Sequence, residues 1–163
     1  QKVSIRAIKA KDTAYRAFAK KLNNLNTGFQ QLNEARESIR IVEALLTHQP
    51  DSIKKEVNLL SSKMQSKIDS IVISYFGKMD EKGYLSHKEL TSNKVNNALS
   101  YYDNRFEEPG QNGKWAEQVA TKEVEQIIKS INNFFTTHWV SYQERVKKLN
   151  TTIFKEREPL KIE

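Results

Sequence analysis

Residues 15–46 read YRAFAKKLNNLNTGFQQLNEARESIRIVEALL. Apolar side chains recur here at intervals of three or four residues, the spacing that places them on one face of an α-helix. The pattern starts after Asp12 or Thr13, either of which can cap a helix, and should end at Gln49 because Pro50 follows it. The stretch therefore predicts one helix of about 35 residues and about 50 Å. Its apolar positions are Tyr15, Phe18, Leu22, Leu25, Phe29, Leu32, Ala35, Ile39, Val42 and Leu46.

Gly28 lies inside this predicted helix. A glycine in a helix interior costs about 1 kcal/mol relative to alanine, because it gives up more backbone freedom. We therefore expect another element to approach the backbone closely at Gly28.

Three further apolar stripes follow. One runs from Ile53 to Tyr75, and its short connection to the first helix predicts an antiparallel hairpin. A shorter helix should follow the capping-box pattern that begins at Ser86, and the glycines and proline of residues 107–113 should end it. The last stripe runs from Trp115 to Ile153, and its breadth indicates contact with two other helices.

These stripes predict an all-α fold, an elongated up-down-up-down four-helix bundle with long first and fourth helices and extended termini. In that topology both ends of the chain leave the bundle at one pole. We divide the chain into a basic inter-domain linker over residues 1–11, a helical bundle over 12–157 and an extended C-terminal tail over 158–163.

Composition narrows the class of protein. The chain has 163 residues, 5 glycines, 3 prolines and no cysteine, which argues against collagen-like, disulfide-rich and zinc-thiolate proteins. Its mean hydropathy of −0.71 gives no reason to expect membrane insertion. The net charge of +7 comes almost entirely from residues 1–21, so we do not expect nucleic-acid binding by the folded surface. The first 20 residues contain no apolar run typical of a signal peptide.

The sequence shows no pattern for catalysis, metal binding or a cofactor. No nucleophile elbow, phosphate loop or dinucleotide fingerprint is present. The loop from Asp80 to Glu89 partly matches a calcium-binding EF-hand, but Lys78 and Lys82 occupy ligand positions. His48, His87 and His138 are not in paired spacing. We therefore predict no catalytic residue, no metal site and no cofactor.

A few aromatic residues are candidates for ligand binding. Tyr101, Tyr102 and Trp115 flank the glycine-containing break before the last helix. Trp139 belongs to an aromatic run that can stack on sugar rings, although residues at helical spacing more often form a core.

Several motifs together resemble a known region. The chain, from about Asp12 onward, is similar to the C-terminal helical region of large bacterial proteins built from sortilin-like or BNR-repeat β-propellers, which are grouped with glycosyl hydrolases. The resemblance implies an N-terminal β-propeller in the same chain and a periplasmic or extracellular location. Any catalytic site would belong to the propeller. The motifs are Phe29–Arg36, Gln49–Asp51, Glu107 with Pro109 and Gly110, Val124–Ile127, Phe134 with Phe135, and Arg157–Lys161.

We therefore expect a non-catalytic accessory or scaffolding domain that packs against the propeller or another partner. The alternative is a glycan- or peptide-binding helical module that uses the aromatic candidates. Self-association also stays open, because long helices with broad apolar faces often associate.

Overall fold

The computed structural model describes residues 4–80, 83–84, 90–103 and 110–148. Helices dominate the described chain, and two short strands pair antiparallel beside it, with Met79 opposite Tyr84. The elements are α1 (Ile5–Leu45), the 3₁₀ turn η1 (Leu46–His48), α2 (Asp51–Phe76), β1 (Met79–Asp80), β2 (Gly83–Tyr84), α3 (Thr91–Ser100), α4 (Gln111–Asn133), the π-helical segment η2 (Phe134–Trp139) and α5 (Val140–Lys148).

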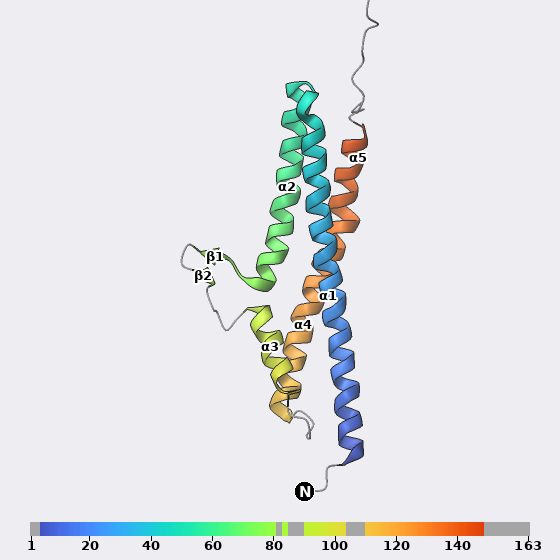
Figure 1. The fold of residues 1–163 in the computed structure, drawn as a ribbon, viewed down its shortest axis with the longest axis vertical. Helices are drawn as coiled ribbons and strands as arrows, with labels where there is room; N and C mark the ends of the chain where they lie inside the picture. The colour runs from blue at the N-terminus through green and yellow to red at the C-terminus, as the bar shows by residue number, and fades with distance from the viewer. Residues whose placement is uncertain (1–3, 81–82, 85–89, 104–109, 149–163) are drawn as a thin grey trace, which may run out of the picture.

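The helices form three rods that lie side by side (Figure 1). α1 is one rod, and α4, η2 and α5 together make the second, which we call the last rod. α2 and α3 follow one another along the third rod and contact the last rod at different levels. The predicted all-α bundle of four helical segments, with the first and last long, is confirmed.

The direction of α3 differs from the predicted up-down-up-down order. Residue numbers rise along α2 and α3 while those of their partners in the last rod fall, so both helices run antiparallel to that rod. α1 and the last rod are therefore parallel, and the start of α1 and the end of α5 lie at opposite ends of the bundle (Figure 1). The pairs are Glu56 with Arg145, Ser61 with Tyr142, Thr91 with Glu123 and Tyr102 with Glu117.

The helix lengths leave room for α3 in series with α2. α1 has 41 residues and α2 has 26, so at 1.5 Å per residue α2 leaves about 22 Å of α1 uncovered. α3, with 10 residues and a length of about 15 Å, packs on α4 beside that remainder and makes few contacts with α1. Burial of the apolar stripe of the last rod thus favours two shorter helices in series.

The extended start expected for the chain is wrong where the structure describes it, while the inter-domain linker over residues 1–11 stays a prediction. α1 begins at Ile5, so residues 5–11 are helical and not extended. Nothing in the segment breaks a helix, and Ile8 continues the apolar stripe two turns before Tyr15. α3 begins at Thr91, later than the predicted cap at Ser86, which lies outside the described residues. The C-terminal tail over 158–163 also lies outside them.

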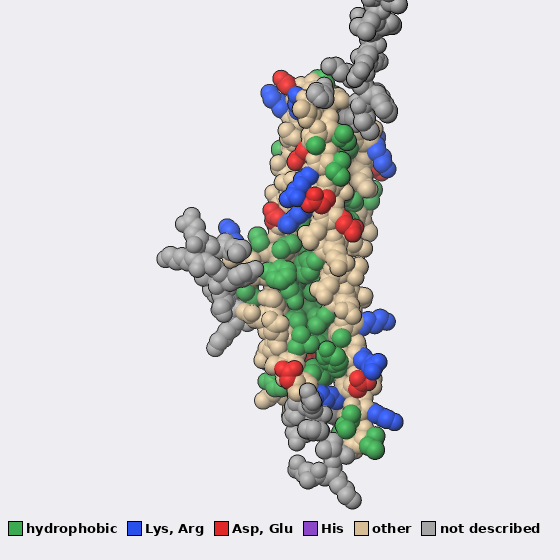
Figure 2. All heavy atoms as spheres, viewed as in Figure 1, with side chains coloured by type: hydrophobic (Ala, Val, Ile, Leu, Met, Phe, Trp, Pro, Cys, Tyr) green, Lys and Arg blue, Asp and Glu red, His purple; other side chains and the backbone are tan. Residues whose placement is uncertain are grey.

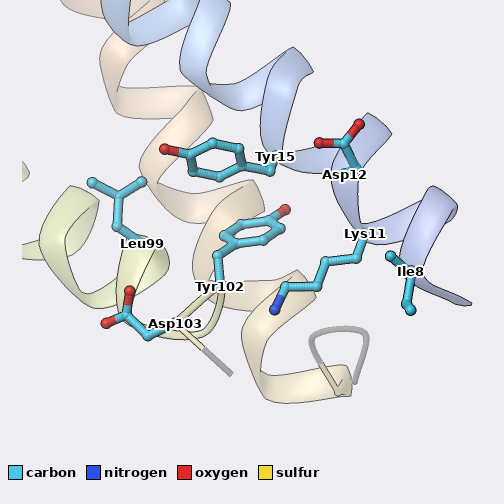
Figure 3. A pocket seen from close by; sticks show the side chains of 7 residues that line it. All are labelled: Ile8, Lys11, Asp12, Tyr15, Leu99, Tyr102 and Asp103. Carbon is cyan, nitrogen blue, oxygen red and sulfur yellow. The ribbon is translucent and has the colours of Figure 1, made fainter. Parts of the chain in front are cut away.

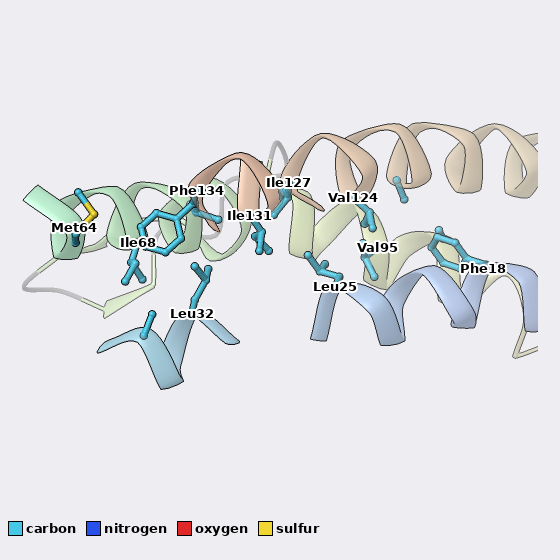
Figure 4. Packing of buried hydrophobic residues seen from close by; sticks show 14 of the residues in the cluster. Phe18, Leu25, Leu32, Met64, Ile68, Val95, Val124, Ile127, Ile131 and Phe134 are labelled. Carbon is cyan, nitrogen blue, oxygen red and sulfur yellow. The ribbon is translucent and has the colours of Figure 1, made fainter. Parts of the chain in front are cut away.

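The core is a continuous column between the rods (Figure 4). Phe18, Leu25 and Leu32 of α1 are each about 1% exposed, as the spacing of the stripe predicts. Opposite them the last rod contributes its own buried stripe, and α2 and α3 complete the column. These facing residues are Val124, Ile127, Ile131, Phe134, Met64, Ile68 and Val95.

The π-helical segment η2 has a visible cause in the sequence. Buried residues of the last rod step by three or four until Phe134, and Trp139, whose ring lies against that of Phe134, comes five residues later. A π-helical turn holds one more residue than an α-helical turn, so it returns residue i+5 to the same face. The wider turn keeps Trp139 in contact with Phe134 and Tyr142.

Gly28 is in close contact with another helix, as we predicted. A Cβ atom at this position would lie 2.8 Å from Cδ1 of Ile131 in α4. Carbon atoms pack at about 3.5–4.0 Å, so the glycine is what allows α1 and α4 to approach.

We predict that Gly28→Ala loses about 1 kcal/mol of unfolding free energy, because overpacking outweighs the gain in helix propensity. In an Ile131→Val background the clashing Cδ1 atom is absent, and the same substitution should stabilise the protein by up to about 1 kcal/mol. Urea unfolding of the four proteins measures both effects. An equal effect of Gly28→Ala in the two backgrounds would show that the contact does not limit packing.

Candidate interaction site

α1 and α3 both pack against α4 but make few contacts with each other. Between them lies an open cleft of about 440 Å³, near the start of α1 and the end of α3 (Figure 3). We call it the α1–α3 cleft. It is lined by Ile8, Lys11, Asp12, Tyr15, Leu99, Tyr102 and Asp103.

Two tyrosine rings form the aromatic part of the α1–α3 cleft (Figure 3). The centroids of Tyr15 and Tyr102 are 5.5 Å apart, and the rings are tilted by 59°. Tyr15 is 44% exposed, whereas Tyr102 is only 9% exposed. The cleft therefore has an accessible ring on α1 and a fixed ring at the end of α3.

Glu117 of α4 holds the ring of Tyr102 in place. The Tyr102 hydroxyl donates a hydrogen bond to the Glu117 carboxylate. Burial first, and then the hydrogen bond and negative charge of Glu117, raise the pKa of Tyr102 well above its usual range. The hydroxyl therefore stays neutral, and its donor is occupied inside the protein. The side chain offers a ligand its ring and not a proton.

Apolar side chains continue from the cleft along the junction of α1 with α2 and α3. Figure 2 shows them gathered on this face of the molecule. Above the cleft, the ring of Phe29 lies 5.3 Å from that of Tyr75 and 5.5 Å from that of Phe76. Phe76 is exposed, and Phe29 and Tyr75 are half-buried. Contiguous exposed apolar surface of this kind often marks an interaction site.

The first turns of α1 carry unpaired cations, of which Lys11 lines the cleft. Among the described residues, Arg6, Lys9 and Lys11 have no ion-pair partner, whereas Arg16 binds Asp12 at 2.8 Å. The basic excess found in residues 1–21 therefore lies partly on the α1 side of a cleft that has both polar and apolar walls.

The four aromatic candidates do not form one site. Tyr102 lines the α1–α3 cleft, but Tyr101 and Trp115 do not. Trp115 is 66% exposed on the first turns of α4, and Tyr101 is exposed at the end of α3. Trp139 is on η2, 24 residues further along the last rod, or about 36 Å at 1.5 Å per residue.

Trp139 borders a different cleft, between α1 and η2, whose polar lining includes Gln31, Glu34 and Asn132. Its indole ring stacks on Tyr142 at 5.2 Å and lies within 31° of the plane of Phe134. Neighbouring rings thus lie against the indole, which favours a packing role over sugar stacking.

The sequence analysis missed Tyr15, Ile8 and Leu99 as site residues. Tyr15 was assigned to the core stripe because of its spacing, but only the ring of Tyr102 lies against it from the α3 side, and 44% of Tyr15 stays exposed. Spacing shows which residues share a face, and it does not show where a partner helix leaves that face open.

The described residues contain no group of three His, Asp or Glu side chains that could hold a metal ion. Within the same residues, every buried side-chain nitrogen or oxygen has a hydrogen-bond partner. Most of the loop compared with an EF-hand, including Glu89, lies outside the described chain. No described helix has the length and apolar character needed to cross a bilayer.

Comparisons with protein families, curated proteins and solved structures give no match to this chain.

We predict that Tyr102→Phe weakens the pH dependence of stability in alkaline solution. The unfolded tyrosine loses its proton near pH 10.0, while the folded protein keeps it to higher pH. The contribution of Tyr102 is therefore complete below pH 10.0 and is lost as the pH rises above it. Denaturant unfolding from about pH 8 to 11 should show a shallower fall for Tyr102→Phe.

Tyr101→Phe is the matched control, because Tyr101 is an exposed ring next to Tyr102 and outside the cleft. It should keep the wild-type slope. Identical slopes for Tyr102→Phe and the wild type would contradict the assignment of a buried, hydrogen-bonded hydroxyl.

Proposed function

We propose that this chain is a non-catalytic helical interaction domain that packs against a partner through the α1–α3 cleft. The observation that carries the proposal is the cleft itself, where aromatic and aliphatic side chains stay accessible between two helices that scarcely touch. A fold that buries Phe18 and Leu25 almost completely leaves Tyr15 and Ile8 on its surface.

The energetics favour a partner at this surface. Removal of apolar surface from water contributes roughly 25 cal/mol per Å², and the fixed ring of Tyr102 loses little freedom when a partner binds. A concave surface can also surround an inserted side chain, which a flat patch cannot do. These properties are typical of an anchoring pocket in a protein interface.

The resemblance to β-propeller proteins supports one identity for the partner. We propose that the domain is an accessory part of a larger exported protein and that it packs against a propeller that precedes it. The cleft includes Ile8 and Lys11, close to the start of α1, so a domain joined before residue 1 would be tethered near it. Tethering raises the effective concentration of a weak contact.

Glycan binding is the second candidate, and one observation favours it. The cleft beside Trp139 combines an aromatic side chain with Gln31, Glu34 and Asn132, whose polar groups suit sugar hydroxyls. The rings packed against the indole make this the weaker candidate.

In the larger protein, we predict that Ile8→Glu lowers the melting temperature of the preceding domain, because a buried glutamate in the interface would be costly. Deletion of residues 4–148 should lower it at least as much. Leu59→Glu is the control, since Leu59 is also an exposed aliphatic residue but lies on α2. Differential scanning calorimetry measures all three variants.

Circular dichroism of the isolated variants checks that each bundle stays folded. A preceding domain that melts at the same temperature with and without residues 4–148 would contradict the accessory function.

A further inference from the structure

We propose that the α1–α3 cleft binds an amphipathic helix of a partner protein, with the apolar face of that helix in the cleft and acidic residues along α1. The proposal rests on the proposed function and adds the chemistry of the partner. It is carried by the shape of the cleft and by the charges beside it.

The shape of the cleft suits a helix. α1 and α3 flank it and α4 lies behind them, an arrangement that leaves a groove between two helices. On α1 the lining runs from Ile8 to Tyr15, about 11 Å at 1.5 Å per residue, which matches about two turns of a partner helix. Side chains of that helix at positions i, i+3, i+4 and i+7 would contact Tyr15 and Ile8 on one side and Leu99 on the other.

The charges select an acidic partner. Arg6, Lys9 and Lys11 lie near the start of α1, and none of them has an ion-pair partner within the described part of the chain. Asp12, the one carboxylate on this part of α1, is already bound to Arg16. Carboxylates on the exposed flank of a partner helix would pair with Lys9 and Lys11 and set its direction in the groove. Asp103, at the α3 side of the cleft, disfavours acidic residues on the opposite flank.

A second copy of this chain fits the cleft poorly. α1, α2, α3 and α5 each carry a net positive charge and α4 is neutral, so no described helix supplies the acidic flank. Two copies joined at the cleft would also bring their basic α1 helices together, which like charges oppose.

A membrane surface fits poorly as well. Tyr102 is 9% exposed and Tyr15 is 44% exposed, so a flat bilayer would contact the rim and leave the pocket unfilled. A helix can insert a side chain there.

The test uses a synthetic helical peptide of about three to four turns, with leucines at i, i+3, i+4 and i+7, glutamates along one flank of this apolar face and glutamines elsewhere. A matched peptide carries lysine in place of each glutamate. Fluorescence anisotropy of the labelled peptides, titrated with the whole chain, measures the dissociation constants. We expect the glutamate peptide to bind and the lysine peptide to bind at least about tenfold more weakly.

Variants locate the binding site. Ile8→Glu should weaken binding by about tenfold or more, because one buried aliphatic contact is lost and a repulsive charge is added. Lys11→Glu should weaken the glutamate peptide and strengthen the lysine peptide. The controls Leu59→Glu and Lys63→Glu make the same changes on α2 and should leave both dissociation constants unchanged.

Equal affinity for the two peptides, or equal losses in Ile8→Glu and Leu59→Glu, would overturn the proposal. A dimer in sedimentation that Ile8→Glu dissociates would identify a second copy as the occupant. Binding to phosphatidylcholine–phosphatidylserine vesicles that depends on Ile8, without peptide binding, would identify a membrane. Each of these last two results also overturns the proposal.

If Ile8→Glu destabilises the larger protein but no peptide binds, the accessory function stands and only the acidic helix is wrong.

Discussion

Burial of one long apolar stripe on α1 determines the rest of this structure, because α2 and α4 both pack along it. The last rod lies along much of α1, and Gly28 allows the two to approach closely beside Ile131. α2 is shorter than α1 and covers only part of its other side. α3 makes up most of the remaining length against the last rod, but it does not close onto α1. The α1–α3 cleft is the space that this arrangement leaves open.

The periodicity of the sequence was sufficient to predict the helices and most of the core. Spacings of three and four residues correctly placed Phe18, Leu25 and Leu32 inside. The sequence could not give the direction of α3, because the link from Gly77 to Leu90 is long enough to reverse the chain or to continue it. The start of α1 was misplaced because the possible caps Asp12 and Thr13 were given more weight than the absence of any helix breaker before them.

The candidate site was predictable only in part, for a physical reason. Tyr102 was identified because it lies near a break between helices, and the structure places it in the cleft. Tyr15 shares its spacing with buried residues and is exposed only because α3 stands away from α1. Trp139 shows the opposite case, since the five-residue step after Phe134 coincides with a π-helical turn that keeps the indole among other rings. Exposure thus depends on which helices face each other, and a single stripe does not contain that information.

α1 and the last rod run parallel to each other. This direction places the two ends of the bundle far apart, and it leaves the cleft between α1 and α3. Spin labels on cysteines introduced at Ser4 and Lys148 test it directly, because the chain has no cysteine of its own. Pulsed electron paramagnetic resonance should give a distance on the order of 60 Å, the length of α1. A distance on the order of 20 Å, about two helix diameters, would place both labels at one pole and contradict the account.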